Sequence, residues 1–141
     1  MFARAALVIA TTLAVASASV LVRAPACARS YTVVAGDNCD IISAKTSTST
    51  YQLAAANPDK INEQCTDLTV GEVLCLGFVG QDCNDVHVVQ SDDVCVDIAN
   101  EAGTTLSILL ANNPNVDSTC SNIYPGEVLC TADKIIPYTS A

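Results

Sequence analysis

The chain has 141 residues, a formal net charge of −9 and eight cysteines. Such an acidic protein repels phosphate backbones and anionic lipid headgroups, so we expect neither nucleic acid nor a membrane surface as a partner. Its length is sufficient for one ordinary domain or for two very small ones.

Residues 1–18 are predicted to form a secretory signal peptide. Arg4 provides a basic start, and an uncharged stretch of apolar and small residues follows over 5–22. Ala16-Ser17-Ala18 fits the small-residue cleavage rule, while Ala24-Pro25-Ala26 would place cleavage as late as residue 26. A membrane anchor is the alternative for this run, but its Ala, Ser and Thr content favours a signal peptide. The predicted protein is therefore secreted and extracellular, either free or associated with a cell wall.

The cysteines of a short exported chain predict a disulfide framework. All of them are assigned to disulfides: Cys27, Cys39, Cys65, Cys75, Cys83, Cys95, Cys120 and Cys130. A single histidine and the lack of any Cys-x-x-Cys pair argue against a metal site. No metal and no cofactor are expected.

The same unit occurs twice in the chain. The gaps between cysteines are 12, 26 and 10 residues in the first set of four and 12, 25 and 10 in the second. The pentapeptide that ends at Cys75 recurs residue for residue at an offset of 55, ending at Cys130. This period predicts two modules, at 27–78 and 83–132, followed by a tail at 133–141. Since Cys27 has a counterpart in Cys83, cleavage of the leader is expected before Cys27.

Each module reads as strand, helix, helix and strand, which is an α+β fold. The apolar and β-branched runs predict strands, and the turn residues that precede the helical patterns predict helix starts. Asp37 and Asp93 are interpreted as helix caps. The second helix of each module is expected to end at an Asn-Pro pair. Where ranges are defined, the predicted elements are strands at 31–34, 73–76, 86–89 and 128–131 and helices at 93–101 and 105–112.

Disulfides are expected to decide whether modules of this size fold. A core of about 50 residues rarely supplies more than about 3–5 kcal/mol, and one disulfide adds about 2–4 kcal/mol. Four cysteines allow three pairings in each module. Antiparallel first and last strands would place Cys27 near Cys75 and Cys83 near Cys130, while bridges between the modules remain open.

The combination of these blocks resembles the LysM family, in its secreted fungal effector form with two tandem modules. In the first module the resemblance is carried by Tyr31-Thr32-Val33, Gly36-Asp37-Asn38, Asn57-Pro58 and the run from Leu68 to Cys75. The second module repeats most of these blocks. The resemblance implies a βααβ module that binds chitin or other N-acetylglucosamine oligomers, with a role in shielding hyphae or keeping chitin fragments from host immunity.

The family's sugar groove lies between the first strand–helix loop and the second helix–strand loop. Carried onto this chain, it implies two sets of carbohydrate-binding residues. In the first module these are Gly36, Asp37, Asn38, Asn57, Pro58, Asp59, Lys60 and Ile61. In the second they are Asp92, Asp93, Asn113, Pro114, Asn115 and Val116. Whether the ligand also joins two copies of the chain into a dimer stays open.

Two departures from the pattern bear on binding. Asp92 stands where the first module has Gly36, which is expected to reshape that turn and to weaken or abolish the second site. Aromatic residues are few near both predicted grooves, so we expect binding to rest on hydrogen bonds. These departures favour an alternative, a LysM-like structural or interaction protein without sugar binding; a peptidoglycan binder is a third hypothesis.

Catalysis is not expected. The chain contains no Gly-x-Ser-x-Gly, His-Glu-x-x-His or P-loop motif. Its 15 acidic residues always offer some pair of carboxylates, but a module of about 50 residues leaves no deep cleft in which to distort a sugar. We therefore predict a binding protein and no catalytic residues.

Overall fold

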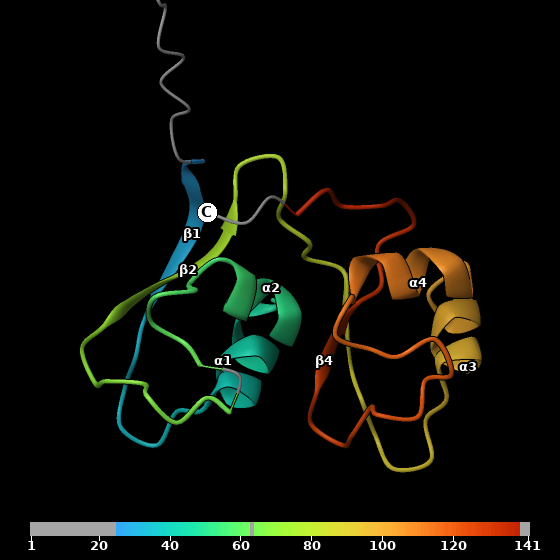
Figure 1. Cartoon of the computed structure of the whole chain (residues 1–141), viewed down its shortest axis with the longest axis horizontal. Helices are drawn as coiled ribbons and strands as arrows, with labels where there is room; N and C mark the ends of the chain where they lie inside the picture. Colours follow the sequence, from blue (N-terminus) through green and yellow to red (C-terminus); the bar gives the residue numbers. More distant parts are fainter. Residues whose placement is uncertain (1–24, 63, 139–141) are drawn as a thin grey trace, which may run out of the picture.

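The computed structural model describes residues 25–62 and 64–138, which form two modules (Figure 1). Module 1 contains β1 (Cys27–Thr32), α1 (Cys39–Thr46), α2 (Thr50–Ala55) and β2 (Val73–Phe78). Module 2 contains β3 (Val86–Val88), α3 (Cys95–Glu101), α4 (Leu106–Asn112) and β4 (Val128–Cys130). The α+β class and the order of elements are confirmed. The predicted leader at 1–18 lies outside the described residues, among which no helix has the length and hydrophobicity to cross a membrane.

The first strand begins earlier than the predicted range of 31–34. β1 pairs antiparallel with β2 from Cys27, opposite Phe78, to Thr32, opposite Val73. Val33 still continues the ladder, since its N–H donates to the Glu72 carbonyl at 2.9 Å. The side-chain pattern located the β-branched end of the strand but not the backbone pairing that extends it. In module 2, β3 and β4 pair antiparallel in the same way.

Each module has its own hydrophobic core. In module 1, Ile42 and Leu53 from the helices pack with Leu74 from β2, and all three are fully buried. In module 2, the corresponding core contains Ile98, Leu109 and Leu129. The disulfides are Cys27–Cys75, Cys39–Cys65, Cys83–Cys130 and Cys95–Cys120. The two pairings expected from antiparallel strands are therefore present, and every bridge lies within one module.

The modules stack head to tail. Figure 1 shows α1 and α2 between the sheet of module 1 and β4, with α3 and α4 on the far side of β4, and both α1 and α2 contact β4. Comparing equivalent positions of the two modules shows how much surface this interface covers. Val73 and Val128 occupy the same position of the two modules, but Val73 is 51% exposed and Val128 is 0% exposed. The helices of module 1 thus cover the sheet of module 2.

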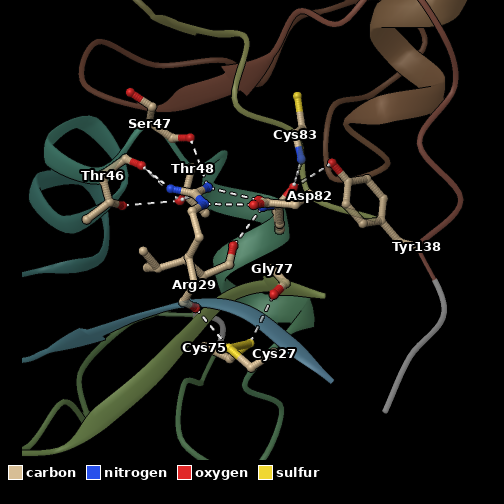
Figure 2. A network of polar contacts seen from close by, with 12 residues as sticks. Cys27, Arg29, Thr46, Ser47, Thr48, Cys75, Gly77, Asp82, Cys83 and Tyr138 are labelled. Atoms are coloured by element: carbon tan, nitrogen blue, oxygen red, sulfur yellow. Dashed lines mark hydrogen bonds and ion pairs between the residues drawn. A yellow bond between two sulfur atoms is a disulfide. The ribbon is translucent and has the colours of Figure 1, made fainter. Parts of the chain in front are cut away.

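An ion pair at the junction fixes this arrangement (Figure 2). Arg29, on β1, donates from Nε to Asp82 Oδ2 at 2.7 Å and from Nη2 to Asp82 Oδ1 at 2.8 Å. Its Nη1 also donates to the Thr46 carbonyl at 2.6 Å. Burial acts to raise the pKa of Asp82, but the hydrogen bonds from Arg29 and Gln52 outweigh it and lower that pKa. A two-point pair of this kind holds the linker rigidly against module 1.

Gln52 extends this network into module 2. Its Nε2 donates to Asp82 Oδ1 at 2.7 Å, and its Oε1 accepts from the backbone N–H of Cys83 at 2.8 Å. Gly77 leaves the space that this network needs, because a Cβ at that position would lie 2.5 Å from both Gln52 Nε2 and Asp82 Oδ1. The junction is therefore built from a half-buried ion pair and a buried amide whose polar groups satisfy one another.

The C-terminal tail straps the two modules together. Asn112 donates from Nδ2 to the Lys134 carbonyl and accepts from the N–H of Ile136, whose side chain is buried beside the Cys83–Cys130 disulfide. Tyr138 then crosses to module 1 and packs edge-on against Tyr51, with ring centroids 5.3 Å apart. No pattern in the sequence predicts this role for residues 133–138.

Candidate functional site

A hollow of about 250 Å³ lies on module 1 between the start of α1 and the connection from α2 to β2. Asn38 and Asp40 line one side, and Ile61 and Gln64 line the other. Thr50 and Ala54 of α2 also line it, and the second module contributes Tyr124. Residues with amide, aliphatic and aromatic side chains therefore line one open depression.

A disulfide joins the two walls of this hollow. Cys39 is the first residue of α1 and Cys65 lies in the connection to β2, so their bond ties together segments 26 residues apart in sequence. Beside it, Asn62 and Thr66 exchange two hydrogen bonds, of 2.7 and 3.0 Å, that close the loop on itself. The hollow is therefore preorganised, which lowers the entropic cost of binding a ligand.

The predicted residues of the first loop have distinct roles. Gly36 has a φ of 90°, in the left-handed region that favours glycine. Asp37 accepts from the N–H of Val34 at 2.9 Å and from the hydroxyl of Tyr31 at 2.8 Å, and the first of these bonds is the main cause that lowers its pKa. Asn38, which lines the hollow, is the N-cap of α1 and accepts from the N–H of Ile41.

These contacts correct the interpretation of Asp37 and Asp93 as helix caps. Each carboxylate instead stabilises the turn before the helix, because it accepts a hydrogen bond from the backbone N–H three residues earlier in the chain. In module 2, Asp93 accepts from the N–H of Gln90 at 2.7 Å and lies 2.7 Å from His87 Nε2. His87 thus replaces Tyr31, while the N-cap of α3 is Val94, which makes no side-chain capping bond.

The expected reshaping of the second turn does not occur. Asp92 adopts a φ of 73°, close to the 90° of Gly36, and the hydrogen bonds of the turn are the same in both modules. Aspartate tolerates the left-handed region better than most residues. The Asp93 carboxylate also stabilises the turn by accepting from the N–H of Gln90. The loss of the glycine is therefore no reason to expect a distorted second site.

The two Asn-Pro asparagines are buried and face inward. Asn57 donates to the carbonyls of Leu53 and Cys75 and accepts from the N–H of Cys75. Asn113 makes the same three bonds to Leu109 and Cys130. Each side chain therefore joins the end of the second helix to the closing strand, and its polar atoms are used within the module.

The other predicted residues are divided between several places. Ile61 and Val116 belong to the cores of their modules, and Ile61 also reaches the hollow. Pro58, Asp59 and Lys60 line a separate depression of about 330 Å³ beside β2, together with Asn57. Pro114 is exposed. Asn115 donates to Glu127 at 2.6 Å. Of the first predicted set, the hollow thus brings together only Asn38 and Ile61.

Sequence reasoning missed the hollow's contribution from the other module. Tyr124 lies 84 residues from Asp40, to which its hydroxyl donates at 3.3 Å. No local pattern points from one to the other, because the contact depends on how the modules stack. Asp40, Thr50 and Gln64 were also missed, although Gln64 lies next to Cys65 in the predicted loop.

We expect Glu127→Gln to stabilise the protein at neutral pH. Glu127 is 3% exposed, and its Oε2 has no hydrogen-bond partner in the described part of the chain. Burial raises the pKa of Glu127 above its ordinary 4.5. The folded state therefore binds this proton more tightly than the unfolded state does. The free energy of unfolding thus falls as the pH rises above the pKa that Glu127 has in the unfolded chain.

Glutamine keeps the oxygen that accepts from Asn115 and removes the buried charge, which should gain about 1 kcal/mol at pH 7. Thermal melting of both proteins at pH 4 and pH 7 measures the difference, which should shrink at pH 4. Glu72→Gln, at the half-buried equivalent position in module 1, is the matched control. A lower melting temperature for Glu127→Gln at pH 7 would contradict the prediction.

Comparison with known proteins gives a match in each half of the chain. The family model described as "LysM domain" matches residues 31–77 and 87–131, which correspond to modules 1 and 2. The matched segments contain both walls of the hollow, including Tyr124 in the second segment.

Curated relatives share the same family name. The secreted LysM effector LysM1 of Trichophyton rubrum is 31% identical over 127 residues, covering 74% of this chain and 50% of its own. A secreted LysM effector of Pochonia chlamydosporia is 32% identical over 108 residues, covering 75% of this chain and 15% of its own. The non-secreted LysM effector LysM19 of Penicillium expansum is 29% identical over 114 residues, covering 77% and 9%. This chain thus spans half or less of these relatives.

Proposed function

Since the chain belongs to the LysM domain family, we propose that it is a secreted carbohydrate-binding protein whose ligand is chitin or its N-acetylglucosamine oligomers. The observation that carries the proposal is the preorganised hollow of module 1, which lies within the matched segments. Asn38 and Gln64 offer amides for the hydroxyl and acetamide groups of a sugar, and Ile61 offers an apolar surface for the acetamide methyl.

The net charge favours an uncharged polymer. A protein with a formal charge of −9 repels acidic ligands, and the stem peptides of peptidoglycan carry carboxylates, whereas chitin is neutral. Chitin binding should therefore be nearly independent of salt, while any affinity for peptidoglycan should rise as salt screens the repulsion. Peptidoglycan remains the second candidate ligand.

The biological role follows from the ligand and from the relatives. Two of the compared proteins are named secreted effectors, which supports a role for this chain outside the cell. Binding there would shield hyphal walls or sequester chitin fragments from a host's receptors. The function is binding and involves no catalytic residues. Production of the full-length chain in a secreting host would test export, with Ser19 or Cys27 as the expected new N-terminus.

A co-sedimentation assay tests the core of the proposal. The secreted, disulfide-bonded protein is mixed with insoluble chitin, cellulose or peptidoglycan at low and high salt. We expect it to sediment with chitin at every salt concentration and to stay in solution with cellulose, which lacks the acetamide group. Sedimentation with peptidoglycan alone would redirect the function to bacterial walls. A protein that stays in solution with all three would favour a structural or interaction role.

A further inference from the structure

The hollow of module 1 is bounded on one side by module 2. Tyr124 stands in the turn before β4 and lines the hollow with a side chain that is 45% exposed. Its hydroxyl reaches Asp40 at 3.3 Å. A second contact holds this segment in place, since the backbone N–H of Val128 donates to Thr50 Oγ1, at the start of α2, at 3.0 Å.

The tyrosine supplies what module 1 lacks. Among the described residues, those that module 1 contributes to the hollow carry amides, a carboxylate, a hydroxyl, a disulfide and aliphatic groups, and none is aromatic. Pyranose rings present C–H faces that pack well on aromatic rings, and a tyrosine offers such a face at low conformational cost. Tyr124 is 45% exposed, and it lines the same depression as the amides of Asn38, Asn62 and Gln64.

We propose that Tyr124 is a sugar-contacting residue of the module 1 groove, where its ring packs against a sugar unit held by the amides of module 1. The groove is thus a composite site that needs both modules. This inference rests on the proposed carbohydrate-binding function. It assigns to module 2 a role that does not depend on a groove of its own.

Comparison of the two repeats supports the assignment of the aromatic ring to module 2. At the offset of 55 residues, the counterpart of Tyr124 is Thr69, which is exposed. Module 1 therefore carries no equivalent ring at that position. The Arg29–Asp82 ion pair ties the linker to module 1, and Gln52 of module 1 accepts from the N–H of Cys83, the first residue of module 2, so both contacts hold module 2 against module 1.

Calorimetric titration with the soluble chitin tetramer tests the inference on the full secreted chain. We expect Tyr124→Ala to raise the Kd about tenfold and Tyr124→Phe, which keeps the ring, to raise it less than about threefold. Ile135→Ala is the control, because Ile135 is an exposed apolar residue of the tail that does not line the hollow. Circular dichroism and a count of free thiols establish that each variant is folded.

The outcomes separate the two proposals. An unchanged Kd for folded Tyr124→Ala, with normal binding by the parent protein, overturns the composite site and leaves the proposed function intact. Equal losses in Tyr124→Ala and Tyr124→Phe would show that the hydroxyl, through Asp40, acts in place of the ring, which also overturns the inference. If the parent protein binds no tetramer at all, the proposed function fails first. A second readout is tyrosine emission, since the chain has four Tyr and no Trp.

Discussion

Changing both Cys83 and Cys130 to alanine is expected to lower the free energy of unfolding by about 5–6 kcal/mol. The bond closes a loop of 47 residues, for which chain entropy alone predicts about 4 kcal/mol. Both cysteines are also buried, at 2% and 0% exposure, and they pack with Ala132 and Ile136. Their removal leaves a cavity that adds about 1–2 kcal/mol.

Module 1 offers a matched control for this effect. The Cys27–Cys75 bond closes a loop of 48 residues, so its entropic contribution is the same, but Cys27 is exposed and Cys75 is half-buried. Equilibrium unfolding in guanidinium chloride, without reductant, should therefore find the Cys83/Cys130 variant less stable by the cavity contribution. Equal stability of the two variants would mean that burial of the second bond contributes nothing.

Asn113→Ala is expected to cost about 3–5 kcal/mol in unfolding free energy. The side chain is 1% exposed and makes three hydrogen bonds, to the carbonyl of Leu109 and to the N–H and carbonyl of Cys130, at 2.8 Å each. Alanine leaves these backbone groups buried and unpaired, and each such group costs about 1–3 kcal/mol. Urea unfolding monitored by circular dichroism measures the loss.

This prediction also separates a structural role from a ligand role for the Asn-Pro asparagine. Asn100→Ala, on the exposed face of α3, should change stability by less than about 0.5 kcal/mol and serves as the control. If Asn113 served a ligand in place of the fold, its alanine variant would be as stable as the Asn100 variant. The same contacts predict a comparable loss for Asn57→Ala in module 1.

Local patterns predicted most of the fold. The repeat of cysteines and of the run before Cys130 located both modules, and the antiparallel strands placed Cys27 beside Cys75. Local chemistry was less reliable where two residues compete for one role. Asp37 and Asn38 are both good caps, but only the structure distinguishes the carboxylate that braces the turn from the amide that caps α1.

Features that depend on how the two modules stack could not be predicted from the sequence. The sequence positions of Val73 and Val128 are equivalent, so no pattern could predict that one is exposed and the other buried. Tyr124 was missed as a lining residue of the hollow for the same reason, since its partners belong to the other module. Tyr138, which meets Tyr51, is a third example.

Because the sheet of module 2 covers the helices of module 1, the duplicated halves are no longer interchangeable. A substitution at Val128, which is fully buried, should change stability more than the same substitution at Val73, which is half-exposed. Reversing the order of the two halves would bring Thr69 to the junction in place of Tyr124. The order of the two modules in the stack therefore matters, and equivalent positions of the two repeats are under different structural constraints.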